Sequence, residues 1–231
     1  MGHLRPLEPP PAELTASCQA LTPGCRDHVY IFMVNGLTLL PHVCGSMNGV
    51  AAFVEQLGFC KPRVASHYWR WCFQNEIRRI HQEDPAACFV LVGYSIGGSV
   101  VYSMAQTLEE EGIFIDLMVY IDAHSFIHDL NQRPANVGKV VGINSTSWCL
   151  SGKCHPGEEC HWVETLFHLK APRKEQTLHT LARELTELAT THCCGSAKPR
   201  FEGAPPELSL PEPAAVKPDL PAAPGPTDGG H

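Results

Sequence analysis

A serine between two glycines is the arrangement with the clearest chemical potential in this sequence. Residues 93–97 are GYSIG, which fits the pattern G-x-S-x-G, and they directly follow the apolar run 87–92. In this pattern the serine occupies a sharp turn between a strand and a helix, which exposes its hydroxyl as a nucleophile. Glycines two residues before and after leave space that Cβ atoms would fill. The spacing therefore predicts a nucleophile elbow at Ser95, with Gly93 and Gly97 as its glycines.

The segments around this motif alternate between short apolar runs and amphipathic stretches. Strands alternating with helices predict βαβ units, and strands that are apolar almost throughout indicate that both sheet faces are covered. We therefore expect an α/β fold with a mainly parallel sheet and helices on both faces. The expected strands are 28–34, 63–69, 87–92, 116–121, 139–143 and 162–167, and the expected helices are 46–59, 71–83, 97–111 and 175–191.

The elbow and the order of these elements resemble the α/β-hydrolase superfamily, and more narrowly its small thioesterase-like and lipase-like members. The resemblance covers about residues 28–192, and the serine motif is its specific part. It implies a minimal α/β-hydrolase fold without a large cap domain. It also implies cleavage of an ester or thioester by a serine, an acid and a histidine that follow one another in this order along the chain.

Two residues at the ends of later strands are the candidates for the acid and the base. In open α/β sheets the active groups gather at the carboxyl ends of strands. Asp122 directly follows the fourth expected strand, and His168 directly follows the last. Asp122 could instead cap a short helix at 124–130. His161 and His124 are the alternative bases, and most of the 13 histidines must be ordinary surface residues.

An oxyanion hole in this family uses one backbone N–H after the serine and a second from the loop after an early strand. The first donor is then Ile96. The second would come from the loop that follows the first expected strand, at Gly36 or Leu37. The implied chemistry is a Ser95–His168–Asp122 triad that forms an acyl-enzyme intermediate, which water then hydrolyses.

The ends of the chain differ in composition from its middle. Prolines are frequent near the N-terminus and beyond residue 195, and no aromatic residue follows Phe201. Such segments bury too little apolar surface to offset their ordering entropy. We expect a disordered N-terminal segment over 1–25, an α/β-hydrolase domain over 26–194, and a disordered Pro/Ala-rich tail over 195–231. The tail is a candidate for protein contacts, although a solvated tail is the simpler interpretation.

The composition of the chain argues against nucleic acid as a partner and against a membrane span. The chain has 231 residues and a formal net charge of −7, which argues against a nucleic-acid-binding surface. No stretch approaches the roughly 18 apolar residues that a membrane span requires. The first residues lack the apolar core of a secretory signal, so a cytoplasmic protein is expected. The predicted partner is a small-molecule acyl ester or thioester, and no cofactor is expected.

Eleven cysteines include a cluster that falls in one loop. Cys149, Cys154 and Cys160 lie close in sequence to His155 and His161, and zinc accepts ligands of both types. The usual C-x₂-C spacing is absent, so no metal is predicted. The simpler interpretation is a reduced loop, or one disulfide between Cys149 and either Cys154 or Cys160.

Two other functions stay open at this point. The same scaffold could act as an acyltransferase, in which an alcohol or amine replaces water in the second step. A hydrolase-like protein without catalytic activity could also act through its proline-rich tail or its cysteine loop.

Overall fold

A parallel sheet forms the centre of the molecule. The computed structural model describes residues 10–36, 47–59, 62–124, 130, 132–148 and 150–193. The strand order is β2-β1-β3-β4-β5-β6, and every neighbouring pair runs parallel, which confirms the expected α/β class. The strands are β1 Val29–Val34, β2 Arg63–Ala65, β3 Cys88–Tyr94, β4 Ile115–Ile121, β5 Val137–Ser145 and β6 Glu159–Val163.

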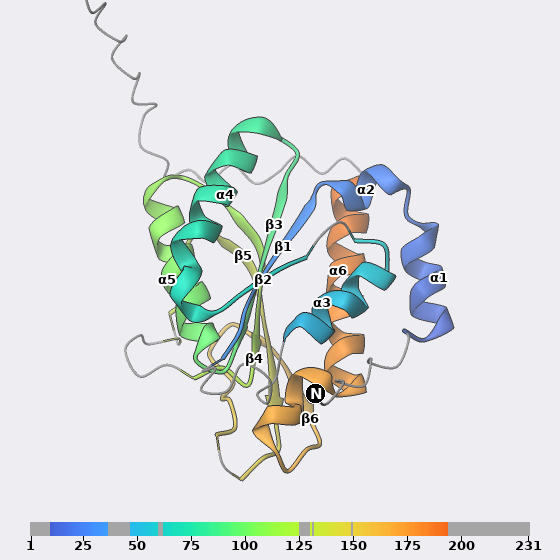
Figure 1. Ribbon diagram of the computed structural model, residues 1–231, viewed down its shortest axis with the longest axis vertical. Helices are drawn as coiled ribbons and strands as arrows, with labels where there is room; N and C mark the ends of the chain where they lie inside the picture. Colours follow the sequence, from blue (N-terminus) through green and yellow to red (C-terminus); the bar gives the residue numbers. More distant parts are fainter. Residues whose placement is uncertain are drawn as a thin grey trace, which may run out of the picture.

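Helices cover both faces of this sheet (Figure 1). One face carries α4 and α5, and the other carries α3 and α6, with α1 and α2 outside α6. The two short 3₁₀ helices, η1 and η2, precede α4 and α6. The helical bounds are α1 Ala12–Ala20, α2 Pro23–Asp27, α3 Met47–Gln56, η1 His67–Trp69, α4 Arg70–Glu83, α5 Gly97–Glu110, η2 His168–Arg173 and α6 Glu175–Cys193.

The central strand β3 shows why the apolar runs are so continuous. All seven of its residues are buried. Because successive side chains in a strand point to opposite faces, Val90 and Val92 enter the core beneath α3 and α6. Phe89 and Leu91 enter the core beneath α4 and α5. A strand with helices on both sides has no solvent face, so its sequence does not alternate with polar residues.

The N-terminal region differs from the expected disordered segment 1–25. Residues 12–20 and 23–27 are helical, and Cys18 is completely buried. The Cys18 thiol lies 2.8 Å from the Thr186 hydroxyl of α6, within hydrogen-bond distance. The prolines suggested disorder, but Pro11 and Pro23 stand at helix starts, where proline is tolerated. The expected tail 195–231 lies outside the described residues.

Two strands are shorter than expected, or shifted. β2 covers only 63–65, and the aromatic residues that follow form η1. β6 covers 159–163 instead of 162–167, because it pairs only with β5 and that pairing ends at Ser145 opposite Val163. His161 therefore lies within β6, and His168 opens η2 five residues after Val163, the last residue of the strand. Most of the short helix considered at 124–130 lies outside the described residues.

Among the helices of the described ranges, none combines the length and the hydropathy that crossing a bilayer requires.

Candidate active site

Ser95 lies in the turn between β3 and α5, in a conformation that is unusual for a side-chain-bearing residue. Its φ is 54°, in the left-handed region. A non-glycine residue there costs of order 1–3 kcal/mol and persists only when its surroundings impose it. The Ser95 amide donates to the Ile121 carbonyl at 3.0 Å, which holds the turn against the end of β4. Ser95 itself is only partly buried, so this strained turn presents the serine at the carboxyl edge of the sheet.

The two glycines of the elbow are required by close backbone contacts. A Cβ atom on Gly93 would lie 2.6 Å from the Gly97 carbonyl oxygen and 2.7 Å from the Gly98 Cα. A Cβ atom on Gly97 would collide with the Val34 carbonyl oxygen of β1. Because backbone atoms cannot move aside as a flexible side chain can, only glycine fits at either position. The helix can therefore begin directly beside the serine.

Gly93→Ala is expected to destabilise the fold by about 3 kcal/mol, because the added methyl group overpacks a rigid turn. The measurement is the free energy of unfolding from urea titration. Gly24→Ala is the matched control, since a Cβ atom at Gly24 meets nothing within 4 Å. The control should be as stable as the parent or slightly more stable. Equal stability of Gly93→Ala and the parent would contradict this account of the elbow.

The loop after β1 passes directly beside the serine. A Cβ atom on Gly36 would lie 2.9 Å from the Ser95 Cβ, so the Gly36 backbone borders Ser95. Asn35 anchors the loop, because its amide donates to the Ala65 carbonyl and its side-chain oxygen accepts from the Met47 amide. Ile96 is the N-cap residue of α5. Gly36 and Ile96 thus flank Ser95, whereas Leu37 lies outside the described residues.

Asp122 and His168 are in direct contact. His168 Nδ1 lies 3.1 Å from Asp122 Oδ2, and with a carboxylate as acceptor this nitrogen carries the proton. The two side chains are almost completely inaccessible to solvent. Asp122 Oδ1 accepts from the Ser145 amide at 2.5 Å and from the Gly152 amide at 3.2 Å. The carboxylate is therefore held from both sides, with one oxygen directed at the imidazole.

The pKa of Asp122 is set by two opposing effects. Burial of Asp122 favours its neutral form, but the hydrogen bonds from His168, Ser145 and Gly152 stabilise its charge more strongly. The pKa therefore lies below the ordinary value for an aspartate. An ionised carboxylate in this position can orient the imidazole and stabilise it when it becomes protonated.

Three residues that the sequence analysis did not single out hold His168 and Asp122 in place: Tyr94 contacts His168, and Ser145 and Gly152 contact Asp122. The Tyr94 ring stacks on the His168 ring, with centroids 5.1 Å apart, and the Tyr94 hydroxyl donates to the His168 carbonyl at 3.1 Å. Tyr94 is a variable position of G-x-S-x-G, so the motif carried no signal for it. Ser145 ends β5, and its place at a strand end was the only signal that could have found it. Gly152 had no sequence signal.

The alternative bases occupy different positions. The His124 ring lies 5.4 Å from the His168 ring by centroids, and the His124 amide donates to the Ser95 carbonyl at 3.0 Å. The side chain of His161 instead contacts Glu159 and Arg183. Between the Ser95 hydroxyl and His168, both described residues, the structure forms no hydrogen bond. Hydrogen bonds between catalytic groups are often long without substrate and tighten when substrate binds.

The cysteine loop is linked differently from the expected pairing with Cys149. Cys154 and Cys160 form a disulfide, and Cys149 lies outside the described residues. The expectations of a reduced loop or of a disulfide to Cys149 are therefore wrong, because β6 begins at Glu159 and brings Cys160 back beside Cys154. Thiols joined in a disulfide are not thiolate ligands, so these two cysteines do not offer zinc the donors considered from the sequence.

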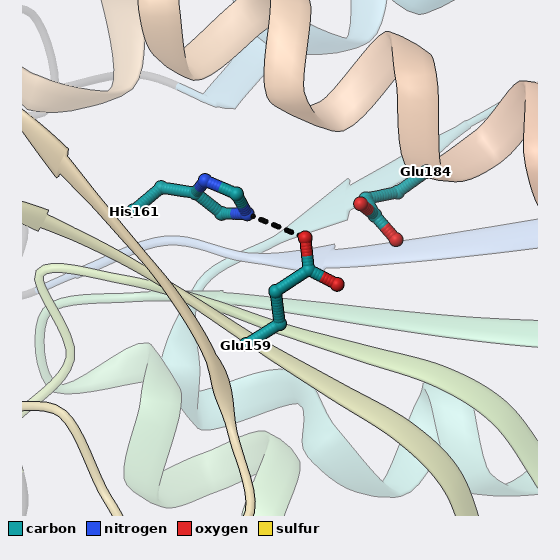
Figure 2. Close-up of side chains that lie close together, drawn as sticks. All are labelled: Glu159, His161 and Glu184. Atoms are coloured by element: carbon teal, nitrogen blue, oxygen red, sulfur yellow. Dashed lines mark hydrogen bonds and ion pairs between the residues drawn. The ribbon is translucent and has the colours of Figure 1, made fainter.

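A separate group of possible metal ligands lies between β6 and α6. Glu159, His161 and Glu184 place one ligand atom each within 4.8 Å of one another (Figure 2). Their oxygens already have cationic partners, however. Lys139 Nζ lies 2.9 Å from Glu159 Oε2 and 2.5 Å from Glu184 Oε2. Arg183 contacts both glutamates as well. A metal ion would have to displace these cations, so the cluster is an ion-pair network.

This network joins three elements of the fold. Burial of the Lys139 ammonium opposes its charge, but the two glutamates outweigh that effect and raise its pKa to about 12. Lys139 lies on β5, Glu159 on β6 and Glu184 on α6. Since β6 is an edge strand that pairs only with β5, the network fastens it to the helix above.

One family model matches a central part of the chain. This model, described as "Thioesterase domain", matches residues 73–141. The matched range includes Ser95 and Asp122 and ends before His168. No curated protein matches the sequence.

Solved structures are similar to this chain at low sequence identity. A YdeN-like hydrolase from Pectobacterium atrosepticum is 14% identical with a TM-score of 0.50, over 78% of this chain and 99% of that chain. An α/β serine hydrolase without a lid from Xanthomonas campestris is 16% identical with a TM-score of 0.47, over 75% and 85%. The NocB thioesterase domain is 15% identical with a TM-score of 0.40, over 75% and 97%.

Proposed function

We propose that this chain, a small thioesterase-like α/β-hydrolase, cleaves an ester or thioester through Ser95, His168 and Asp122. The observation that carries the proposal is the buried Asp122–His168 hydrogen bond, formed at the same sheet edge as the strained Ser95 turn. An orienting carboxylate, an imidazole and a nucleophile at a helix N-terminus are the parts that acyl transfer requires. The proposed substrate is a small-molecule acyl ester or thioester.

The reaction proceeds in two halves. His168 Nε2 accepts the proton from the Ser95 hydroxyl as its oxygen attacks the acyl carbonyl, and Asp122 stabilises the resulting imidazolium. The C–O or C–S bond of the substrate then breaks, and the leaving group takes the proton from His168. Water, deprotonated by His168, attacks the acyl-enzyme, and the acid is released as Ser95 regains its proton.

Backbone groups around Ser95 supply the stabilisation of the developing charge. The Ile96 amide, at the start of α5, is the first donor to the oxyanion, and the Gly36–Leu37 segment supplies the second. The helix α5 has 14 residues, and its N-terminus carries the positive end of the helix dipole. This polarity favours negative charge where the tetrahedral intermediate forms.

A fluorophosphonate probe tests the proposal directly, since it reacts covalently with activated serines. The folded protein should gain one probe mass, and peptide mapping should locate it at Ser95. Heat-denatured protein is the control and should stay unlabelled, because activation depends on the folded site. A folded protein that resists the probe, or that carries it on another residue, would overturn the proposal.

A further inference from the structure

Large apolar side chains are exposed around the buried His168. Leu166 is 68% exposed, Phe167 60% and Leu169 46%. Trp148 is 88% exposed, and the hydroxyl of the preceding Ser147 donates to the Leu166 carbonyl at 3.1 Å, which joins the two segments. Clusters of large exposed apolar side chains are candidate interaction sites on a protein surface. We call Trp148, Leu166, Phe167 and Leu169 the apolar rim.

Basic side chains accompany the apolar rim. Leu166, Phe167, Lys170 and Lys174 line one open groove with a volume of about 620 Å³, and Glu164 is the acidic side chain on its wall. Lys170 Nζ lies 5.1 Å from the centre of the Phe167 ring. Within the described part of the chain, neither lysine is paired with a carboxylate. Other basic side chains are paired in this way, namely Arg63, Arg78, Arg79, Lys139 and Arg183.

We propose that the apolar rim docks on a lipid surface that carries anionic headgroups. Leucine, phenylalanine and tryptophan tips insert at the boundary between headgroups and acyl chains, while lysine stems lie along apolar surface with their ammonium groups near phosphate. The chain as a whole carries a net charge of −7 and would be repelled by an anionic surface. The lysines beside the apolar rim supply a local charge that complements such a surface.

Docking on a lipid surface also indicates a class of substrate, an inference that rests on the proposed function. His168 lies between Phe167 and Leu169 in the chain, so two residues of the rim flank the candidate base. A protein held by this rim places its site against the lipid, where an acyl ester within the membrane can reach Ser95. The lipid-bound acyl ester is therefore the substrate class that the rim favours.

The test is co-sedimentation of the full-length Ser95→Ala protein with vesicles, so that binding is measured without hydrolysis. Vesicles of phosphatidylcholine containing phosphatidylglycerol should bind the protein, and added salt should weaken the binding. Leu166→Ser with Phe167→Ser should lower the partition coefficient roughly tenfold or more, because two apolar side chains no longer insert. Lys170→Glu with Lys174→Glu should lower it by a similar factor, roughly tenfold, on the anionic vesicles alone.

A matched control comes from similarly exposed aromatic residues in η1 and at the start of α4. Tyr68 is 74% exposed and Trp71 is 56% exposed. Tyr68→Ser with Trp71→Ser should leave vesicle binding unchanged. Among the rim, lysine and control side chains that are substituted, all but Lys174 are exposed, and circular dichroism checks that each variant folds.

Three outcomes would overturn the docking proposal. The first is that the protein does not bind the anionic vesicles, and the second is that the Leu166/Phe167 variant binds them as well as the parent. The third is that the protein self-associates and this variant abolishes the self-association, which would assign the apolar rim to contact with a second copy. Failure of docking while the wild-type protein still reacts with a fluorophosphonate would leave the proposed function standing. Vesicle binding without any labelling would remove the proposed function and retain the docking surface.

Discussion

Ser95→Ala should lower kcat/KM for a p-nitrophenyl ester by about 10⁴-fold or more, because the proposed nucleophile is lost and only binding and oxyanion contacts are left. Alanine keeps the Cβ and removes only the hydroxyl, so the strained turn and its Ile121 hydrogen bond are retained. The measurement is the steady-state rate on a panel of esters and acyl thioesters, together with the free energy of unfolding. Stability close to that of the parent would tie the loss to chemistry.

Ser103→Ala is the matched control for this experiment. Ser103 lies on the same helix, α5, and its hydroxyl accepts a hydrogen bond from Arg70 at the surface. The control should turn over substrate at the parent rate. Full activity in Ser95→Ala, on substrates that the parent cleaves, would mean that another group is the nucleophile.

Asp122→Asn is expected to lower kcat by about 10⁴-fold, because an amide no longer holds His168 in the tautomer that leaves Nε2 free to accept a proton. The substitution is nearly isosteric, but it also places an amide where two backbone N–H groups now donate to Oδ1. We expect KM to change little, since Asp122 is buried beneath the site and does not face solvent. The measurement is kcat and KM across a range of pH.

Asp116→Asn is the control, since Asp116 stands at the other end of β4 and also accepts a backbone hydrogen bond, from the Phe89 amide. It should retain parental activity. If Asp122→Asn keeps the parental kcat and pH profile, Asp122 does not orient the base.

The lowered pKa of Asp122 adds a dependence of stability on pH. A carboxyl whose pKa is lower in the folded state stabilises the fold above its unfolded pKa of about 3.9, and this stabilisation is lost as the pH falls through the folded value. Asp122→Asn should therefore be less stable than the parent at neutral pH, and the difference should shrink in acid. Urea unfolding at both pH values measures it.

Local patterns in the sequence predicted the turn at Ser95. The sharp turn needs glycines two residues before and two residues after Ser95. This need for glycine is visible in the motif because the glycines are close to Ser95 in the chain. The apolar runs predicted the parallel sheet, since a strand covered on both faces must be apolar throughout. Asp122 and His168 were predicted from their places after strands, and the structure brings these two side chains into contact.

Only the tertiary structure decided which distant groups meet. Asp122 contacts Ser145 and Gly152, and His168 contacts Tyr94. These contacts join residues far apart in the chain, so no periodic pattern in the sequence predicts them. The same reason explains the wrong disulfide partner and the helices found where disorder was expected, because both depend on packing against β6 or α6. Residue type and spacing by themselves determined the elbow and the sheet around Ser95. The orientation of the carboxylate and imidazole, and the exposure of the apolar rim beside them, came only from folding.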